Sequence, residues 1–261
     1  RAMGIIHTGF GVGATLGPLL VTVLISLGWS WRVAFGVLAA AEIVLAIAFV
    51  VTVSGIEANP QDSGSRPSVG SNGIVLALSL AVFFLYAGIA AGTGAWSYSL
   101  LTEGRGINTG VAGVAVAAYW GGVTAGRVAL GVFGNRIEPN RVLTLSALGT
   151  VASLGLLWIA PTPWLGIVGL VASGLSHGFV FPLEVLLTPQ RFGAGFTPWA
   201  VGYEIAAANV GVAVLSGAIG LLVGAMGIGI VAPALFGLAL LLWVAIEMLR
   251  MQSRQRRVVA S

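Results

Sequence analysis

The sequence predicts an all-α protein whose helices form a polytopic transmembrane bundle. Of its 261 residues, 57% are hydrophobic and only 8% are charged, whereas soluble domains carry about 25% charged residues. So few charges could not cover the surface of a soluble protein of this size. The apolar residues also form long runs, and about 20 such residues cross a bilayer as a helix. These observations exclude a soluble enzyme and a disordered chain.

Eight segments are long and apolar enough to cross the membrane. They are too long and too continuously apolar for barrel strands, so we expect helices. Most connections are very short, so neighbouring helices run antiparallel. The exception is 55–72, whose Gly, Ser, Pro and Asn residues indicate a flexible surface linker. The predicted spans are 3–27, 32–54, 73–101, 109–133, 142–160, 164–187, 199–224 and 228–249.

The basic residues indicate how these helices are oriented. All twelve are arginine, and with the N-terminus in the cytoplasm only Arg32 and Arg105 lie outside, as the positive-inside rule requires. We therefore expect a multi-pass protein of the cell membrane, with both ends of the sequence in the cytoplasm. A basic tail at 250–261 is then attracted to anionic lipid. The inner residues are Arg1, Arg66, Arg127, Arg136, Arg141, Arg191, Arg250, Arg254, Arg256 and Arg257.

The chain offers little material for catalysis or for a cofactor. It has no cysteine, two histidines and a single aspartate, Asp62, so a thiolate metal site is excluded and another metal site or a catalytic triad is not expected. No phosphate-binding glycine loop is present. The arginines form no stripe with interleaved aromatic residues, so nucleic acid is not an expected partner. We expect neither an enzyme nor a bound cofactor.

Two glycine-containing segments indicate an internal repeat. Residues 11–17, GVGATLG, and 211–217, GVAVLSG, share two glycines and a valine. Parallel repeats occur in transporters built from two six-helix halves. If the first span corresponds to the seventh, 1–54 holds the last two helices of one half, 55–72 is a cytoplasmic linker, and 73–249 holds all six helices of the other half. Four helices would then precede Arg1, which is not an initiator, so we expect a fragment of a longer chain.

Glycine- and aromatic-rich stretches carry a family resemblance. They are HTGFGVGATLGPLL (7–20) with WRVAF (31–35), FFLYAGIAAGTGAWSYSLL (83–101), YWGGVTAGRVALGVFGNRI (119–137), FVFPLEVLLTPQRFG (179–193) and VGYEIAAANVGVAVLSGAIG (201–220). In this order they resemble the fifth with the sixth, the seventh, the eighth, the tenth and the eleventh helices of the major facilitator superfamily, in its fucose-permease-like branch of sugar:proton symporters. The resemblance implies that fold without its first four helices, alternating access around a midplane site, and a protein that is a monomer at full length.

The sequence departs from this branch in its acidic residues. The seventh-helix pattern often has an acid after Tyr-x-Gly, but Tyr86-Ala87-Gly88 is followed by Ile89 and Ala90. The acids on the branch's first and fourth helices, which are implicated in proton coupling, have no counterpart in these eight spans. Proton symport is therefore an expectation from the resemblance alone.

Ionisable and polar side chains inside the spans are the first candidates for solute binding. An ionisable group at the bilayer centre costs about 2.5–3.5 kcal/mol on insertion scales, so each needs a reason. Glu204 lies beside Tyr203 and shortly before Asn209, and the three could hydrogen-bond a polyol. Glu204 could also hold a proton for coupling. In the structural interpretation its carboxyl reaches the cytoplasmic interface or pairs with another helix.

His177, Phe181 and Glu184 share one helix face at i, i+4 and i+7. The resemblance places this helix at the central cavity, so His177 is a candidate for solute contact, and His177 and Glu184 join Glu204 as candidates for proton coupling. The structural alternatives are a buried packing histidine and a carboxylate that meets Arg191 near the inner end.

Aromatic rings on two further spans could stack on a sugar face. Tyr86 and Trp96 lie on one span and Trp120 on the next. The alternative is ordinary packing, because apolar spans contain aromatic residues in any case.

Three arginines near the inner end of span 109–133 form a separate group. Arg127, Arg136 and Arg141 resemble a degenerate copy of the superfamily's cytoplasmic loop motif. We expect them to form a gating or structural charge network, in preference to contacting the solute.

Glycines at four-residue spacing predict close helix packing, because small residues let helix backbones approach each other in lipid. A sliding surface for alternating access is the functional alternative. The rows are Gly9, Gly13 and Gly17; Gly122 and Gly126; Gly174 and Gly178; and Gly220 and Gly224.

These features together predict a secondary transporter. Its partners are a small polar solute such as a sugar or related metabolite, protons and the lipid bilayer. The alternatives are a transport-inactive membrane sensor with the same fold and a membrane-embedded enzyme, although an enzyme would need a tight cluster of His, Asp or Glu. The expected solute contacts are Tyr86, Trp96, Trp120, His177, Tyr203, Glu204 and Asn209.

Overall fold

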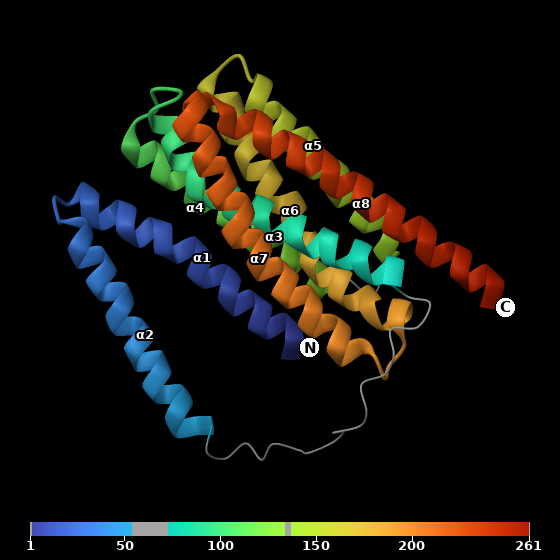
Figure 1. The fold of residues 1–261 in the computed structure, drawn as a ribbon. Coiled ribbons are helices and arrows are strands. Elements are labelled where there is room, and N and C mark those ends of the chain that lie inside the picture. Colours follow the sequence, from blue (N-terminus) through green and yellow to red (C-terminus); the bar gives the residue numbers. More distant parts are fainter. Residues whose placement is uncertain (1, 54–72, 134–136, 261) are drawn as a thin grey trace.

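The structure is a bundle of long α-helices. The computed structural model describes residues 2–53, 73–133 and 137–260, and this part of the chain contains no β-strand. Within it, seven helices are long and apolar enough to cross a membrane, and α1 contributes the apolar stretch Thr15–Ser26. The predicted all-α transmembrane bundle is confirmed (Figure 1). The elements are α1 (Ala2–Ser26), α2 (Trp31–Val53), α3 (Gly73–Thr102), α4 (Thr109–Phe133), α5 (Pro139–Ile159), α6 (Pro163–Phe192), α7 (Thr197–Met226), the short 3₁₀ helix η3 (Ile228–Ile230) and α8 (Val231–Ala260).

The helix ends follow from local chemistry. Glu138 caps α5 by accepting hydrogen bonds from the backbone of Asn140 and Arg141, and Thr162 caps α6 in the same way. Gly227 ends α7 with a φ of 84°, a conformation that glycine adopts without a Cβ penalty. The predicted span 228–249 therefore begins as a 3₁₀ turn before α8.

Two helices continue further than their apolar runs. α6 extends to Phe192, and α8 runs through the basic tail to Ala260. These helices can continue past their apolar runs because Arg, Gln and Met are good helix formers.

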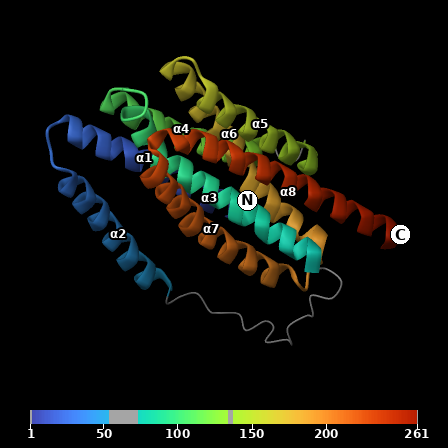
Figure 2. The ribbon, with the colours of Figure 1, turned by 45° about the horizontal axis from the view of Figure 1, so that its top comes forward.

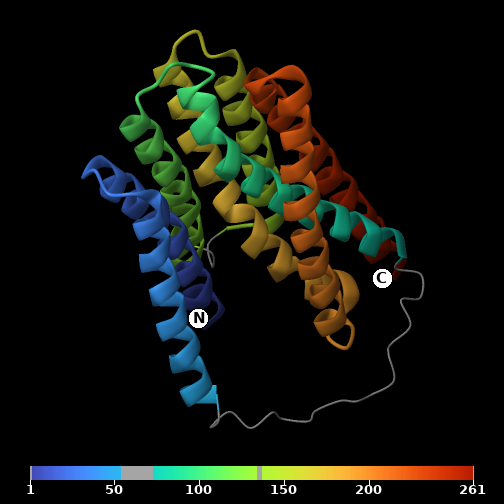
Figure 3. The same cartoon turned by 60° about the vertical axis from the view of Figure 1, so that its left-hand side comes forward.

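Helices α3–α8 form one packed body, and α1 and α2 lie beside it. α3 packs against α7 and α8, α6 packs against α4 and α5, and α1 packs against α4. The main partner of α2 is α1, and Figures 1 and 2 show α2 standing apart from α3–α8. Figure 3 shows α1 and α2 side by side at one flank of the molecule. Most side chains of α2 are exposed accordingly, with Ala34 as the buried exception in its described part.

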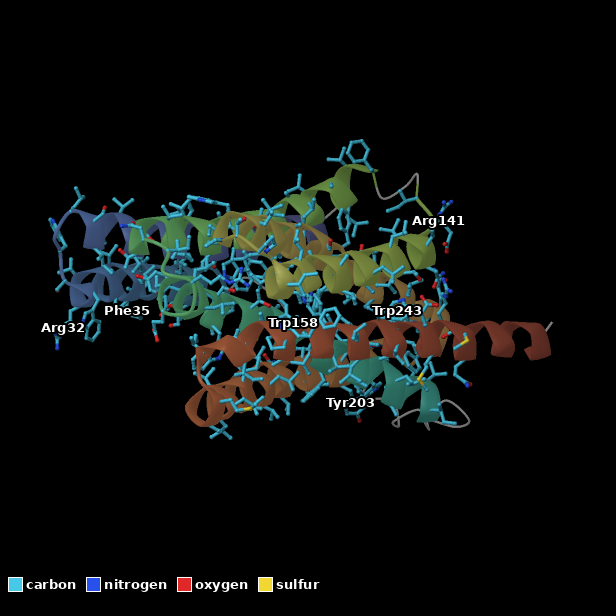
Figure 4. All side chains as sticks on the ribbon, turned by 90° about the horizontal axis from the view of Figure 1, so that it is seen from above. Arg32, Phe35, Arg141, Trp158, Tyr203 and Trp243 are labelled. Atoms are coloured by element: carbon cyan, nitrogen blue, oxygen red, sulfur yellow. The ribbon has the colours of Figure 1, made fainter. Side chains whose placement is uncertain are left out.

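The antiparallel helices give the bundle two distinct ends. The end where α3 and α7 begin and α4 and α6 finish is called the linker end, and the opposite one the far end. Figure 4 shows Arg141 at the linker end and Arg32 at the far end. At each end a side-chain hydrogen bond links two parts of the bundle. At the linker end Thr144 of α5 donates to Glu247 of α8 over 2.6 Å, and at the far end Arg105 reaches α5 from the α3–α4 connection.

Glycine rows allow one close contact, between α4 and α6. Gly122 and Gly126 of α4 face Gly174 and Gly178 of α6, as the four-residue spacing indicates. A Cβ at Gly122 would lie 2.8 Å from the backbone nitrogen of Leu175, and one at Gly126 would lie 3.1 Å from Gly178 Cα. The two backbones therefore meet without intervening side chains.

The other predicted glycine rows behave differently. Gly220 packs under the Trp96 ring, whereas Gly13, Gly17 and Gly224 face open space and Gly9 lies outside the residues whose surroundings the structure describes. The contact between α3 and α7 uses Gly88 and Gly211 instead, since a Cβ at Gly88 would lie 2.7 Å from the Gly211 carbonyl oxygen. Neither of these two belongs to a predicted row.

Candidate functional site

A cavity of about 520 Å³ opens near the middle of the bundle between α3, α4, α6 and α7. Small side chains of α3 leave the space, and aromatic rings of three helices form its walls. The lining residues are Tyr86, Ala87, Ala90, Ala91, Trp120, Arg127, Phe181, Ala208, Asn209 and Val212. Tyr86, Trp120 and Asn209, three of the residues predicted to contact a solute, meet in this one cavity.

His177 lies behind the cavity wall and holds Tyr86 in place. Its Nε2 is 3.0 Å from the backbone carbonyl oxygen of Tyr86, and the two rings stack with centroids 4.6 Å apart and an interplanar angle of 13°. His177 is 1% exposed and is not among the lining residues. The structure therefore places it as a support for Tyr86.

Arg127 enters the cavity from α4. Its Nη2 lies 3.4 Å from the Tyr86 hydroxyl oxygen, and the arginine belongs to the lining. A guanidinium has donors only, so the phenol oxygen accepts in this contact and its proton points elsewhere. The cavity thus contains a positive charge next to a hydroxyl group.

The remaining wall consists of two aromatic rings, one amide and small apolar side chains. Phe181 of α6 packs on Tyr86 with centroids 5.8 Å apart and on Phe83 with centroids 5.5 Å apart. Trp120 comes from α4 and Asn209 from α7. This combination of apolar faces with a few polar groups is typical of small-molecule sites.

A second polar group, the Glu204 cluster, consists of Ser79, Thr188 and Glu204 and lies nearer the linker end. Ser79 of α3 donates to Glu204 Oε1 of α7 over 2.6 Å, and Thr188 Oγ1 of α6 lies 3.0 Å from Glu204 Oε2. All three side chains are fully buried. This buried carboxyl, with its hydroxyl partners, joins three helices.

An ion pair borders the Glu204 cluster on α6. Arg191 Nη1 lies 2.5 Å from Glu184 Oε2, and both side chains are nearly inaccessible. This is the contact that the structural interpretation of Glu184 anticipated. In the described part of the chain no group of three or more His, Asp or Glu side chains could hold a metal ion.

Two further predicted solute contacts, like His177 and Glu204, are not among the lining residues of the cavity. The Trp96 Nε1–H donates to the Ser216 carbonyl oxygen over 3.1 Å, which places its ring in the α3–α7 contact. Tyr203 is 41% exposed, and Figure 4 shows it on the outer surface of the bundle. The structure thus separates Trp96, Tyr203 and the buried Glu204 from the cavity residues Tyr86, Trp120 and Asn209.

Two of the three arginines of the expected charge network lie in different surroundings, and the third is not described. Arg127 lies in the cavity, Arg141 is exposed at the start of α5, and Arg136 lies outside the described residues.

Sequence reasoning did not single out Ser79 or Thr188. A signal existed for each: Thr188 follows Glu184 by one helical turn, and Ser79 precedes Tyr86 by seven residues on the same helix face. Serine and threonine are common in apolar helices, however, and commonly bond their own backbone.

The fold, the cavity and the sequence all indicate the same family of membrane proteins. Several apolar helices of membrane-spanning length line a cavity, as expected of a multi-pass membrane transporter. The sequence model of the Major Facilitator Superfamily matches residues 1–195. The chain belongs to the Major Facilitator Superfamily and is a membrane transporter.

Proposed function

We propose that the protein is a secondary transporter of the fucose-permease-like branch that carries a small polar solute, a sugar or related metabolite, by alternating access. The observation that carries this proposal is the cavity of about 520 Å³ with Tyr86, Trp120, Phe181 and Asn209 in its walls. Rings suit the apolar faces of a sugar, and the amide and phenol suit its hydroxyl groups.

We further propose that α1 and α2 belong to one half of the transporter and α3–α8 to the other. α1 packs on α4, while the main partner of α2 is α1. At the α1–α4 contact, Thr15 and Thr124 lie 3.3 Å apart through their hydroxyl oxygens. Small side chains at this point of the contact would allow the helices to slide, as rocking of one half against the other requires.

Glu204 is the proposed proton carrier. The Thr188 hydroxyl has a single proton, and its oxygen lies 3.1 Å from the Glu184 carbonyl oxygen as well as 3.0 Å from Glu204 Oε2. When Thr188 donates to the Glu184 carbonyl, the Glu204 carboxyl can bond Thr188 only by donating a proton of its own. The cluster thus offers a neutral and an ionised arrangement of one carboxyl, and Arg191 beside Glu184 supplies a nearby positive charge.

The orientation and the assembly state are part of the same proposal. The linker end is cytoplasmic, because the arginine distribution follows the positive-inside rule. The transporter acts as a monomer in the cell membrane, since its pathway runs through the bundle and needs no second copy.

Uptake into proteoliposomes tests this proposal. The full-length protein is reconstituted, and accumulation of radiolabelled hexoses, polyols and sugar acids is measured with and without an inward proton gradient. We expect one solute class to accumulate several-fold more with the gradient. Glu204→Gln, which keeps hydrogen-bonding atoms but cannot exchange a proton, should abolish this stimulation and leave solute exchange intact.

Glu103→Gln is the matched control, because Glu103 is exposed in the α3–α4 connection. It should behave like the unmodified protein. If no solute enters under either condition, a transport-inactive sensor is the better account. If uptake occurs but Glu204→Gln retains the stimulation, the role proposed for Glu204 is wrong.

A further inference from the structure

We propose that the transported solute carries a carboxylate and that Arg127 and Tyr86 form the anion-binding part of the cavity. The proposal rests on the transport function above and narrows its solute to a hydroxylated carboxylate, such as a sugar acid. This role for Arg127 replaces the cytoplasmic charge network that the sequence alone predicts for it.

The described lining of the cavity carries a positive charge. Among the lining residues that the structure describes, Arg127 is charged and none is Asp or Glu. The carboxyls of Glu184 and Glu204 lie in their own buried contacts nearer the linker end. A site with one sign of charge and low-dielectric walls attracts ions of the opposite sign, so this cavity favours anions.

The hydrogen-bond donors of Arg127 and Tyr86 lie next to each other. Arg127 Nη2 lies 3.4 Å from the Tyr86 hydroxyl oxygen, so the guanidinium and the phenol border the same part of the cavity. Because the phenol oxygen accepts in that contact, its own O–H can donate to a ligand. A guanidinium fork with an adjacent hydroxyl matches the two oxygens of a planar carboxylate.

Neighbouring side chains hold Tyr86 in position. His177 stacks on Tyr86 and bonds its backbone carbonyl, and Phe181 packs on the same ring. Tyr86 is therefore fixed before a ligand arrives, which lowers the entropic cost of binding. Asn209 on α7 and the Trp120 ring on α4 remain for the hydroxylated body of the solute.

The charge of the cavity can be measured without knowing the solute. The chain has no cysteine, so Ala87→Cys places a single thiol in the lining. We compare how fast this thiol reacts with two methanethiosulfonate reagents, the anionic ethylsulfonate and the cationic ethyltrimethylammonium derivative. Each rate is divided by the rate of the same reagent with a free thiol in solution. We expect at least a tenfold preference for the anionic reagent and its loss when Arg127→Gln is added.

A second cavity supplies the matched control. About 530 Å³ in volume, it lies between α1, α3 and α4 at the far end, and its described lining includes Ser26, Tyr98 and Thr109 but no charged residue. Ser26→Cys should therefore show no preference between the two reagents. Equal rates at Ala87→Cys, an unchanged ratio after Arg127→Gln, or no reaction with either reagent would overturn the proposal, whatever the transport assay gives.

Ligand binding completes the test. Glucuronate and glucose differ in a carboxylate, and each is titrated against the detergent-solubilised protein with tryptophan fluorescence and thermal stabilisation as readouts. We expect glucuronate to bind at least tenfold more tightly, Arg127→Gln to remove this difference, Arg127→Lys to restore part of it, and Arg32→Gln, at an exposed site on α2, to leave it unchanged. Equal binding of both sugars, or of neither, overturns the carboxylate assignment. The transport function itself fails only if no solute moves in proteoliposomes.

Discussion

The imidazole Nε2 of His177 on α6 lies 3.0 Å from the backbone carbonyl oxygen of Tyr86 on α3. A carbonyl only accepts hydrogen bonds, so Nε2 must carry the proton and donate it. The same histidine stacks on the Tyr86 ring. One buried side chain therefore fixes both the backbone and the ring of a cavity residue.

Replacing His177 separates these two effects. His177→Phe keeps a ring for stacking but loses the hydrogen bond, and we expect a cost of about 0.5–1.5 kcal/mol in stability. His177→Ala also removes the ring and leaves a void, so its cost should be about 2–4 kcal/mol. Unfolding of the detergent-solubilised protein, followed by tryptophan fluorescence, measures both. Tyr203→Phe on the exposed surface should be neutral, and equal stabilities of the two His177 variants would contradict a role for the stack.

The Glu204 cluster predicts a second effect on stability. Thr188→Ala removes a partner of a buried carboxyl and should cost about 1–3 kcal/mol. Thr52 is a matched control, because it bonds its own helix backbone at Ala48 as Thr188 does at Glu184 but lies exposed on α2. Thermal unfolding should show little change for Thr52→Ala. A similar loss in both variants would mean that Glu204 does not depend on Thr188.

The spans were predictable because lipid imposes a strict rule on the backbone. Every polar backbone group must be satisfied within its own helix, so a run of about 20 apolar residues already defines an element. The break between the predicted spans 199–224 and 228–249 lies where the structure places Gly227, whereas the 3₁₀ turn Ile228–Ile230 was not predicted. The rule says where a helix lies in the sequence and nothing about which helix it faces.

The apolar pattern does not predict which helices contact each other. Ser79 and Glu204 are 125 residues apart, and neither local sequence indicates that they meet. Trp96 shows the same limit: its ring was expected at a solute, yet it packs on Gly220 and bonds the Ser216 carbonyl. Arg127 was grouped with the nearby arginines of the sequence, whereas its place in the cavity follows from the approach of α4 to α3.

The glycine contact between α4 and α6 predicts a sharp contrast between two alanine substitutions. Gly122→Ala would put a Cβ 2.8 Å from the Leu175 nitrogen and 2.9 Å from the Val171 carbonyl oxygen. Both are backbone atoms that can yield only if the helices separate, so we expect a loss of about 2 kcal/mol or more. Gly224 has nothing within 4 Å, and Gly224→Ala should be neutral or stabilising by up to about 1 kcal/mol.

Yield of folded protein by size-exclusion chromatography and the midpoint of thermal unfolding measure this contrast. A Gly122→Ala protein as stable as the Gly224→Ala protein would show that the backbones of α4 and α6 do not meet at this point.

At the far end, Arg105 predicts a coupled pair of substitutions. It donates through Nη2 to the carbonyl oxygen of Leu157, in the last turn of α5, where a positive charge also complements the helix dipole. Burial lowers the pKa of its guanidinium, but arginine still keeps its charge at any accessible pH. A Cβ at Gly166 would collide with the guanidinium, so the absence of a side chain there is a condition for the contact.

Arg105→Gln and Gly166→Ala should therefore each destabilise the protein by about 1–2 kcal/mol. Because both variants remove the same contact, the double variant should cost little more than either single one. Arg32→Gln, at an exposed site in the first turn of α2, should change stability by less than about 0.5 kcal/mol. Additive losses in the double variant would mean that the two residues act independently, and Gly166→Ala would then be destabilising for a reason other than the displacement of Arg105.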